Sequence, residues 1–454
     1  MSATVANGRT SAPGPRGYPG VGVVPHLAKD PIGYCTEAMR RYDDLVRLDL
    51  GFASAYLVTL PEHIQHVLVD NVDNYWKGAI FNRARFLFGN GLVLNEGQPW
   101  RRQRRLMQPA FQHRRIESLI PLMADVIRRK LDRWETVRAS GRPMEMNHEM
   151  MTFTLEIVAR TMFSLSVTEE QLAELARSFD VALKHMSLRM NTFFLPEWVP
   201  LPGRRACDEA VASLERLVHG IVAARRRSGE RPDDLLTLLL DARDEETGEG
   251  MSDVEIRDEV MTILFGGYEA TADALTWTWY FLSGHPDVDR RFRDEVADVL
   301  GGRSPTFEDL GRLEYTGRVI QEVLRFYPSF WFSPRAAYKD DEIGGHHVPG
   351  GSVLILSHYS TQHHPRYWED PERFDPDRFL PERSEGRPRH AYYPFGTGPR
   401  MCIGRHFANL EMLLVLSMAA EKWRPRLAPG HPVKPVARIA IRSRNGVWIN
   451  LEKA

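Results

Sequence analysis

The chain has little cysteine and almost no net charge. Its 454 residues include three cysteines, Cys35, Cys207 and Cys402, which lie far apart and cannot all pair. This pattern does not suit a disulfide framework and favours a reducing compartment. The formal net charge is -1, so no global field favours nucleic acid or an anionic membrane. Any charged partner must therefore be recognised by a local patch.

Long apolar runs are also absent. None approaches the roughly 20 residues that cross a bilayer, and the N-terminus lacks the apolar stretch of a secretory signal. We therefore expect a soluble, cytoplasmic protein without a transmembrane anchor. Gly, Pro, Ser and Thr in residues 1–17 predict a flexible tail. No linker or internal repeat follows, which predicts one domain over 18–454.

The residue patterns predict a mainly helical chain with a minor sheet. Strand-like runs occupy 45–50, 55–60, 353–356 and 447–451, and strand-like material also lies near Arg335. Helical patterning dominates 61–300 and returns at 406–422. A chain of this length buries a core large enough to enclose a flat cofactor.

One long helix is marked at both ends. Ser252 and Glu255 form a capping-box pattern, and residues 284–286, Gly-His-Pro, end the segment. The span between them is roughly 30 residues, or about 45 Å. Gly266 and Gly267 in its middle each cost about 1 kcal/mol relative to Ala. Either another element packs closely there, or something flat approaches the backbone.

The strongest chemical signal is the segment 395–404, Phe-Gly-Thr-Gly-Pro-Arg-Met-Cys-Ile-Gly. Backbone amides that face a thiolate stabilise its charge, and we expect Gly396, Gly398 and Gly404 to take positive φ and let the loop pass near a large planar group. Arg400 lies two residues before the sulfur of Cys402, within reach of a carboxylate. A lone cysteine in a glycine-rich turn is usually inert and buried. The complete pattern instead favours a metal ligand.

This segment resembles the haem-binding loop of the cytochrome P450 family, Phe-x-x-Gly-x-Arg-x-Cys-x-Gly. The resemblance covers nearly the whole chain after the tail. It implies the P450 fold, a helix-rich prism with a small β-rich lobe. It also implies haem b (iron protoporphyrin IX) with Cys402 as the iron ligand, and Phe395, Gly396 and Arg400 as cofactor contacts. A thiolate ligand pushes electron density that favours O–O cleavage.

Two further segments match the family's propionate-binding positions. Trp100 and Arg104 are four apart and share a helix face, so both could reach haem propionates. Many family members carry His before that Arg, where this chain has Gln103. Arg335, in Ser-Pro-Arg, resembles a further propionate-binding residue. Each arginine could instead be a solvated surface charge.

Glu322 and Arg325 are three apart on a predicted helix and can pair. On a surface, such a pair contributes under about 1 kcal/mol. In the family, this pair is joined by an Arg from a Pro-Glu-Arg-Phe segment. Residues 371–374 match that segment, so the resemblance implies a structural network that includes Arg373.

The middle of the long helix resembles the family's oxygen-binding motif. Gly266, Gly267, Glu269 and Thr271 fit the motif, and we expect Gly267 to lie near the cofactor. Ala270 replaces the threonine usually credited with proton delivery. Some members also carry Ala there, so activity is not excluded. We hypothesise that water held by Glu269, Thr271 or the substrate relays protons instead.

A local basic cluster lies near the propionate segment. No nucleic-acid module or stacking pattern accompanies it, so we predict no nucleic-acid partner. The family resemblance favours docking of a ferredoxin or flavodoxin served by an NAD(P)H-dependent reductase. A solvated face is about as probable for any single member. The cluster comprises Arg101, Arg102, Arg105, Arg114 and Arg115.

Aromatic and apolar segments at 81–94, 191–202 and 330–332 predict a large apolar substrate, such as a terpenoid, fatty acyl chain, steroid or polyketide. Core packing is an equally good interpretation of each aromatic. The predicted activity inserts one atom of O2 using two electrons from separate partners. One rival is a partner-independent peroxygenase or isomerase, which peroxide-driven turnover would reveal. Another is a non-enzymatic haem sensor, which NAD(P)H-linked turnover would exclude.

Overall fold

The computed structural model describes residues 5–6, 9–42, 45–193, 195–244 and 246–454. These residues group into two compact units. The first comprises 1–79, 318–402 and 435–442, and the second comprises 80–317, 403–434 and 443–454. The chain passes from the first unit to the second within α4 (Gly78–Asn82) and returns within α16 (Glu314–Phe326).

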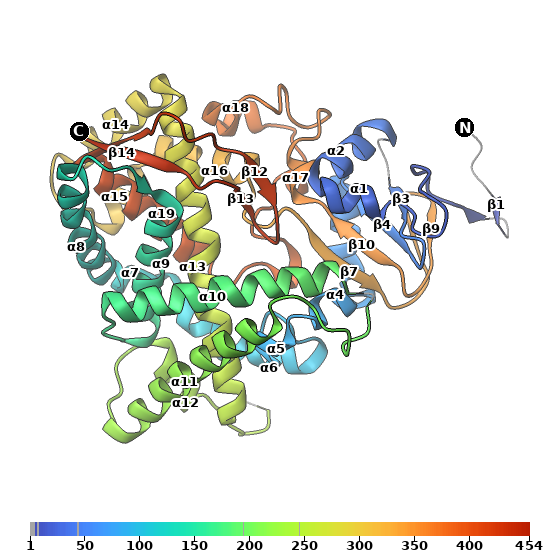
Figure 1. Cartoon of the computed structure of the whole chain (residues 1–454), viewed down its shortest axis with the longest axis horizontal. Coiled ribbons are helices and arrows are strands. Elements are labelled where there is room, and N and C mark those ends of the chain that lie inside the picture. The colour runs from blue at the N-terminus through green and yellow to red at the C-terminus, as the bar shows by residue number, and fades with distance from the viewer. Residues whose placement is uncertain (1–4, 7–8, 43–44, 194, 245) are drawn as a thin grey trace. The chain divides into compact units, whose positions relative to one another are not determined.

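The first unit is built on a five-stranded sheet of order β3-β4-β10-β7-β5 (Figure 1). β10 pairs parallel to β4 and antiparallel to β7. One face of this sheet packs into a buried apolar cluster that includes Val58, Leu354 and Leu356. The strands are β3 (Val46–Asp49), β4 (Ser54–Val58), β5 (Tyr75–Trp76), β7 (Ser333–Ala337) and β10 (Val353–Leu356). The strands predicted at 45–50, 55–60, 353–356 and near Arg335 are therefore confirmed.

Short helices and hairpins complete the first unit. The hairpins are β1 (Val5–Ala6) with β2 (Arg9–Thr10), β8 (Asp341–Ile343) with β9 (His346–Val348), and β12 (Pro435–Ala437) with β13 (Ile441–Ser443). The helices are α1 (Val24–Lys29), α2 (Pro31–Tyr42), α3 (Pro61–Gln65), η1 (His66–Asp70), η2 (Val72–Asn74), α17 (His358–Gln362), η4 (Pro376–Phe379), α18 (Pro381–Ser384), η5 (Arg389–Ala391) and η6 (Gly398–Arg400).

The second unit is mostly helical. Its helices are α5 (Arg85–Phe88), α6 (Gly97–Met107), η3 (Gln108–Phe111), α7 (His113–Ser118), α8 (Ile120–Ala139), α9 (Met146–Phe163), α10 (Glu169–Asn191), α11 (Arg204–Ser228), α12 (Leu235–Asp241), α13 (Asp253–Gly284), α14 (Pro286–Leu300), α15 (Phe307–Arg312) and α19 (Arg405–Ala420). A sheet of order β11-β14-β6 joins β11 (Trp423–Leu427), β14 (Trp448–Lys453) and β6 (Met144–Glu145).

The predicted long helix is α13, which packs along α9 (Figure 1). It begins after Ser252, whose side chain accepts from the amide of Glu255 while the Glu255 carboxylate accepts from the Ser252 amide. This capping box and the end at Gly284 confirm the predicted limits. The helix predicted at 406–422 is likewise confirmed as α19, within two residues.

The N-terminal segment is partly described. β1 and β2 pair antiparallel, and the Arg47 amide donates to the Pro13 carbonyl at 2.7 Å. Residues 1–4 and 7–8 of the predicted tail lie outside the described residues, so its flexibility stays a prediction. Within the described parts of the chain, no helix is long and apolar enough to span a bilayer.

Candidate active site

The loop before Cys402 is held by its own backbone. The amide of Cys402 donates to the Phe395 carbonyl at 2.9 Å, and the Gly396 amide donates to Tyr393 at 2.8 Å. Gly396 and Gly398 have φ of +70° and +68°, as predicted. A Cβ on Gly398 would lie 2.1 Å from the Leu68 carbonyl oxygen, so only glycine fits there.

Positive φ was also expected at Gly404, and that expectation is wrong. Its φ is -86°, and it precedes the first residue of α19. An extended or helical φ is open to every residue type, so Gly404 is not required by backbone conformation.

The three cysteines have different surroundings. No disulfide joins any of the three, all of which lie in the described part of the chain; Cys35 and Cys207 are buried, and Cys402 is exposed. Burial is the main cause that raises the pKa of the Cys35 thiol to about 12 and that of Cys207 to about 11. A thiol with a raised pKa is a poor metal ligand because the thiolate is the ligating form. Cys402 is therefore the cysteine best suited to hold an iron.

Arg335 lies on β7 and is nine-tenths buried, with a contact from its Nη1 to the Pro334 carbonyl at 2.8 Å. Beside it, burial and then the Arg335 charge lower the pKa of His358 to about 3, so this histidine is neutral. A buried guanidinium suits a carboxylate partner. The burial disfavours a solvated surface charge at Arg335, and its role toward a propionate stays a prediction.

Trp100 and Arg104 lie on α6 and are both partly exposed. Between them, the buried Gln103 donates to the Asn90 carbonyl at 2.8 Å and accepts from the Asn95 side chain at 3.1 Å. Gln103 thus anchors the preceding segment to α6. Trp100 and Arg104 stay predicted cofactor contacts.

The basic cluster is largely paired with acids inside the second unit. Arg102 binds Glu255 at 2.7 Å, and Arg105 binds Asp244 at 3.1 Å. Arg115 likewise binds Asp233 at 2.6 Å. These pairs reduce the positive field that the sequence indicated, so the cluster is a weaker docking surface for an acidic protein than its composition predicted.

The middle of α13 has one open side. Every residue of 256–279 is buried except Gly266, which is exposed, and Gly267 and Ala270, which are partly exposed. A Cβ on Gly266 would meet no atom within 4 Å, whereas one on Gly267 would lie 2.6 Å from Val158 of α9. Close packing is therefore confirmed at Gly267, whereas the approach of a flat group to the open backbone at Gly266 stays a prediction. The cofactor contact of Gly267 stays a prediction.

Glu269 and Thr271 are buried, and Ala270 lies between them on the open side. A hydroxyl from α9, that of Thr154, donates to the Tyr268 carbonyl at 3.0 Å. This contact fixes the backbone of α13 just before Glu269. The catalytic roles of Glu269, Ala270 and Thr271 stay predictions.

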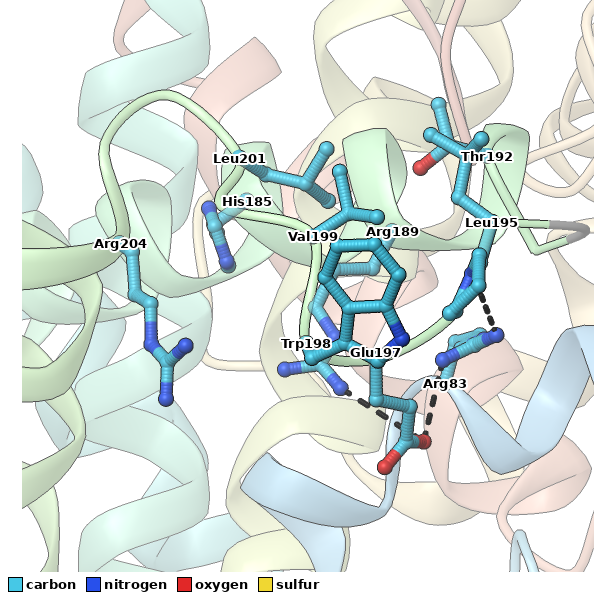
Figure 2. A pocket seen from close by; sticks show the side chains of 11 residues that line it. Arg83, His185, Arg189, Thr192, Leu195, Glu197, Trp198, Val199, Leu201 and Arg204 are labelled. Carbon is cyan, nitrogen blue, oxygen red and sulfur yellow. Dashed lines mark hydrogen bonds and ion pairs between the residues drawn. The ribbon is translucent and has the colours of Figure 1, made fainter.

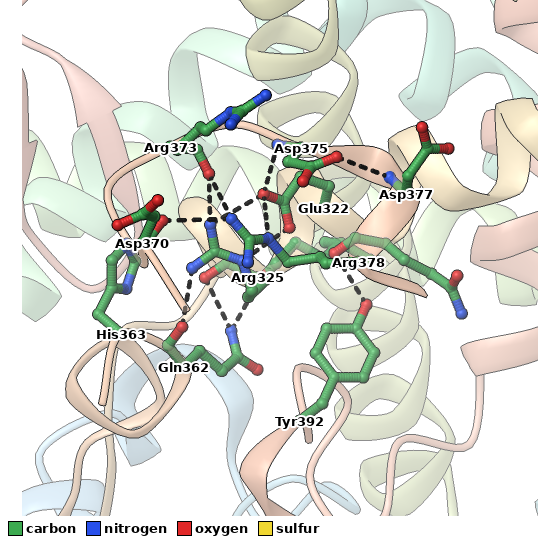
Figure 3. Close-up of polar contacts among 12 residues, drawn as sticks. Glu322, Arg325, Gln362, His363, Asp370, Arg373, Asp375, Asp377, Arg378 and Tyr392 are labelled. Atoms are coloured by element: carbon green, nitrogen blue, oxygen red, sulfur yellow. Dashed lines mark hydrogen bonds and ion pairs between the residues drawn. The ribbon is translucent and has the colours of Figure 1, made fainter. Parts of the chain in front are cut away.

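A buried ionic network in the first unit surrounds Glu322 (Figure 3). Both Glu322 oxygens accept from Arg325, at 2.7 and 2.9 Å, and Arg378 Nε donates to Oε1 at 3.0 Å. The Asp375 amide adds a fourth hydrogen bond at 2.9 Å. Gln362 extends the network because its side chain donates to the carbonyls of Leu324 and Arg325, at 2.9 and 3.1 Å.

The prediction that Arg373 completes this network is wrong. The arginine that reaches Glu322 is Arg378, whereas Arg373 has an exposed side chain and supplies only its carbonyl, which accepts from Arg378 at 2.9 Å. Residues 371–379, Pro-Glu-Arg-Phe-Asp-Pro-Asp-Arg-Phe, contain two Arg-Phe pairs. The η4 turn carries the second pair inward, which the sequence pattern alone does not reveal.

The segment 191–202 lines a pocket of about 360 Å³ in the second unit, as Figure 2 shows. Its walls are less apolar than predicted. Arg83 donates to the Phe193 and Leu195 carbonyls at 2.8 and 2.6 Å and pairs with Glu197 at 3.1 Å. Residue 194 lies outside the described residues. Arg83 was not identified from the sequence because its contacts span more than 100 residues.

The predicted substrate segment 330–332 contributes to packing. Trp331 is buried, and its indole donates to the Arg438 carbonyl at 2.7 Å. This contact favours the core interpretation for Trp331.

Among the described residues, no group of three or more His, Cys, Asp or Glu is placed to hold a metal ion.

Known proteins agree with this geometry. The family model described as Cytochrome P450 matches residues 12–445. Cyclooctat-9-en-7-ol 5-monooxygenase of Streptomyces melanosporofaciens is 37% identical over 93% of this chain and 91% of its own length. Pentalenene oxygenase of Streptomyces avermitilis is 36% identical over 94% of each chain. The crystal structure of the cytochrome P450DA heme domain superposes with a TM-score of 0.89, at 27% identity, covering 98% of both chains.

The chain belongs to the cytochrome P450 family. Its fold is that of P450 haem domains, which confirms the predicted fold class. It is a haem-thiolate monooxygenase, which uses O2 and electrons from redox partners to oxygenate an apolar substrate. The exposed Cys402 in its constrained loop is compatible with such a cofactor.

Proposed function

We propose that this enzyme binds haem b through Cys402 and inserts one oxygen atom into a large terpenoid. The observation that carries the proposal is Cys402 itself, the exposed sulfur in a loop whose two glycines adopt positive φ. The substrate class is supported by relatives that are named cyclooctatin synthase and pentalenene oxygenase. Fatty acyl, steroid and polyketide substrates are the alternatives.

When bound, the haem supplies the activation of O2. The protein's own residues would do the rest. Trp100, Arg104 and Arg335 would bind the propionates by N–H donors. Phe395, Gly396 and Arg400 would hold the cofactor beside the Cys402 loop. Trp100 and Arg104 lie on α6, Arg335 lies on β7, and the last three residues lie in the Cys402 loop, so each set is held by its own element.

The proposed ligand is tested by Cys402→Ser. We expect this variant to lose the red-shifted carbon monoxide band of the reduced protein, because a neutral hydroxyl cannot replace a thiolate donor. Cys35→Ser and Cys207→Ser are the matched controls and should keep the band. Retention of the band in Cys402→Ser would contradict the assignment.

The proposed substrate class is tested by spin-state titration of the ferric enzyme. Cyclic terpene hydrocarbons and alcohols should shift the spin state at lower concentration than fatty acids, steroids or macrolides of similar size. A consistent preference for one of the other classes would replace the terpenoid assignment. Product analysis with the tightest ligand then gives the position of oxygenation.

The proposed electron donor is a ferredoxin or flavodoxin served by an NAD(P)H-dependent reductase, in the cytoplasm. Turnover with such a pair, and little with peroxide alone, would support this donor and exclude the peroxygenase alternative. Because most of the basic cluster is paired with acids, we expect only a modest fall in turnover between low and physiological salt. A steep fall would indicate a larger free basic surface.

A further inference from the structure

One side of α13 carries three polar side chains in a row, followed by two small residues at its open face. Glu255, Glu259, Thr262, Gly266 and Ala270 follow one another at spacings of four, three, four and four residues. At 3.6 residues per turn, these positions fall within a sector of about 100°. Glu255 lies in the partly exposed first turn, and Gly266 and Ala270 lie on the open side.

Glu259 is fully buried, yet only one of its oxygens is bound. Oε2 accepts from the Leu92 amide at 3.1 Å, whereas Oε1 has no hydrogen-bond partner among the described residues. Burial above all, and then the charges of Asp258 and Glu255 on the same helix, raise the pKa of Glu259 to about 8. The segment packed against it contributes the Leu92 amide. Glu259 therefore holds a proton at neutral pH.

Thr262 lies one turn further along the same side. It is buried, and its hydroxyl has no hydrogen-bond partner in the described part of the chain. The hydroxyl faces Gly91, where a Cβ would come within 2.2 Å of Oγ1. Buried polar atoms usually bond to protein or to ordered water. An acid and a hydroxyl with spare bonding capacity thus lie one helical turn apart.

We propose that Glu259 and Thr262 form the route by which protons reach the open face of α13 at Gly266 and Ala270. The proposal rests on the monooxygenase function proposed above. The reaction RH + O2 + 2 e⁻ + 2 H⁺ → ROH + H2O consumes two protons, and the redox partner supplies the electrons. Glu259 would pass a proton through the Thr262 hydroxyl and water, and would regain one from the exposed turn at Glu255. The hydroxyl missing at Ala270 is then unnecessary.

The competing interpretation is that Glu259 only anchors the Leu92 amide. Glu259→Gln separates the two roles, because Gln keeps the acceptor but cannot donate an acidic proton. Thr262→Val removes the hydroxyl at nearly constant shape, and Thr262→Ser restores it. Asp258→Asn is the matched control, because Asp258 anchors the neighbouring Asn90 amide at 2.7 Å.

The first measurement is product formed per NAD(P)H consumed, with peroxide release and the solvent isotope effect on turnover. Glu259→Gln and Thr262→Val should lose coupling at least several-fold, because a positioned acid typically raises the rate of a proton-transfer step by roughly 10²–10⁴-fold. Thr262→Ser should recover it, and Asp258→Asn should match wild type. Unchanged coupling in Glu259→Gln and Thr262→Val would overturn the route. A wild-type enzyme that makes no oxygenated product would overturn the proposed function as well.

The second measurement needs no turnover. A carboxyl with a raised pKa binds more protons in the folded protein than in the unfolded chain. The folded protein therefore loses stability as pH rises from the usual pKa of about 4.5 to the raised pKa of about 8. The Tm of wild type should therefore fall relative to Glu259→Gln between pH 5 and pH 8.5. A Tm difference that does not change with pH would show that Glu259 carries no proton to donate, and would overturn the route.

Discussion

Glu322 and Glu259 are both fully buried, but their surroundings are opposite. Glu322 accepts from two guanidinium groups and a backbone amide. Glu259 accepts from one amide and has two carboxylates nearby on its own helix. A buried charge requires paired and hydrogen-bonded partners, so Glu322 is held as an anion and Glu259 as an acid. The same residue type thus serves as a fixed scaffold in one unit and as a proton store in the other.

The largest effect should come from removing the scaffold anion. Glu322→Ala leaves Arg325 and Arg378 buried without their shared partner, which costs about 3–5 kcal/mol. We expect insoluble or haem-poor protein, measured by the yield of soluble protein and its haem content. Glu372→Ala, which removes an exposed pair with Arg40, should cost under about 1 kcal/mol. A stable, haem-replete Glu322→Ala protein would contradict the role of Glu322 as the anion that holds the two buried arginines in place.

The next effect separates the two arginines of 371–379. Arg378→Lys loses the forked donor that reaches Glu322 and three backbone carbonyls, so we expect a loss of about 2 kcal/mol. Arg373→Lys changes an exposed side chain and should stay within about 0.5 kcal/mol. Denaturant unfolding of both variants gives the values. Equal losses of unfolding free energy in the two variants would show that Arg373 contributes to the network as much as Arg378.

Glu411 on α19 offers a third buried glutamate. Neither of its carboxyl oxygens has a hydrogen-bond partner among the described residues, and burial raises its pKa well above the usual range. Glu411→Met should therefore stabilise the fold by about 1 kcal/mol at pH 8, and by less at pH 5, because pH 5 lies close to the usual pKa of about 4.5 that this carboxyl has in the unfolded chain. Glu411→Gln keeps the unbound polar atoms and should gain less. Destabilisation by both would reveal a partner for this side chain.

The smallest effect concerns the segment 191–202. Arg83→Ala removes two hydrogen bonds to carbonyls and the pair with Glu197. Local opening should become easier by about 1 kcal/mol, so hydrogen exchange there should accelerate roughly fivefold while global stability changes little. Arg204→Ala is the control, because Arg204 lines the same pocket but is exposed. Equal acceleration in both variants would show that Arg83 does not hold the segment.

Local signals explain which features could be predicted. The capping box at Ser252 and Glu255 and the apolar run at 353–356 act within a few residues, so the sequence alone located α13 and β10. The cysteine loop was predictable for the same reason, because its glycines permit the positive φ that the turn requires. Contacts between residues far apart in the sequence were not predictable. Whether Arg373 or Arg378 reaches Glu322 depends on packing, and Arg83 meets its carbonyls across more than 100 residues.

The exposure of Trp198 has an optical consequence. It is 78% exposed and lines the pocket at 191–202, whereas six of the ten tryptophans are buried. An exposed indole emits at longer wavelength than a buried one and is open to soluble quenchers. A ligand that covers Trp198 will therefore shift its emission and shield it from quenching. Emission and the haem absorbance together can tell a ligand bound at this segment from one that has reached the iron.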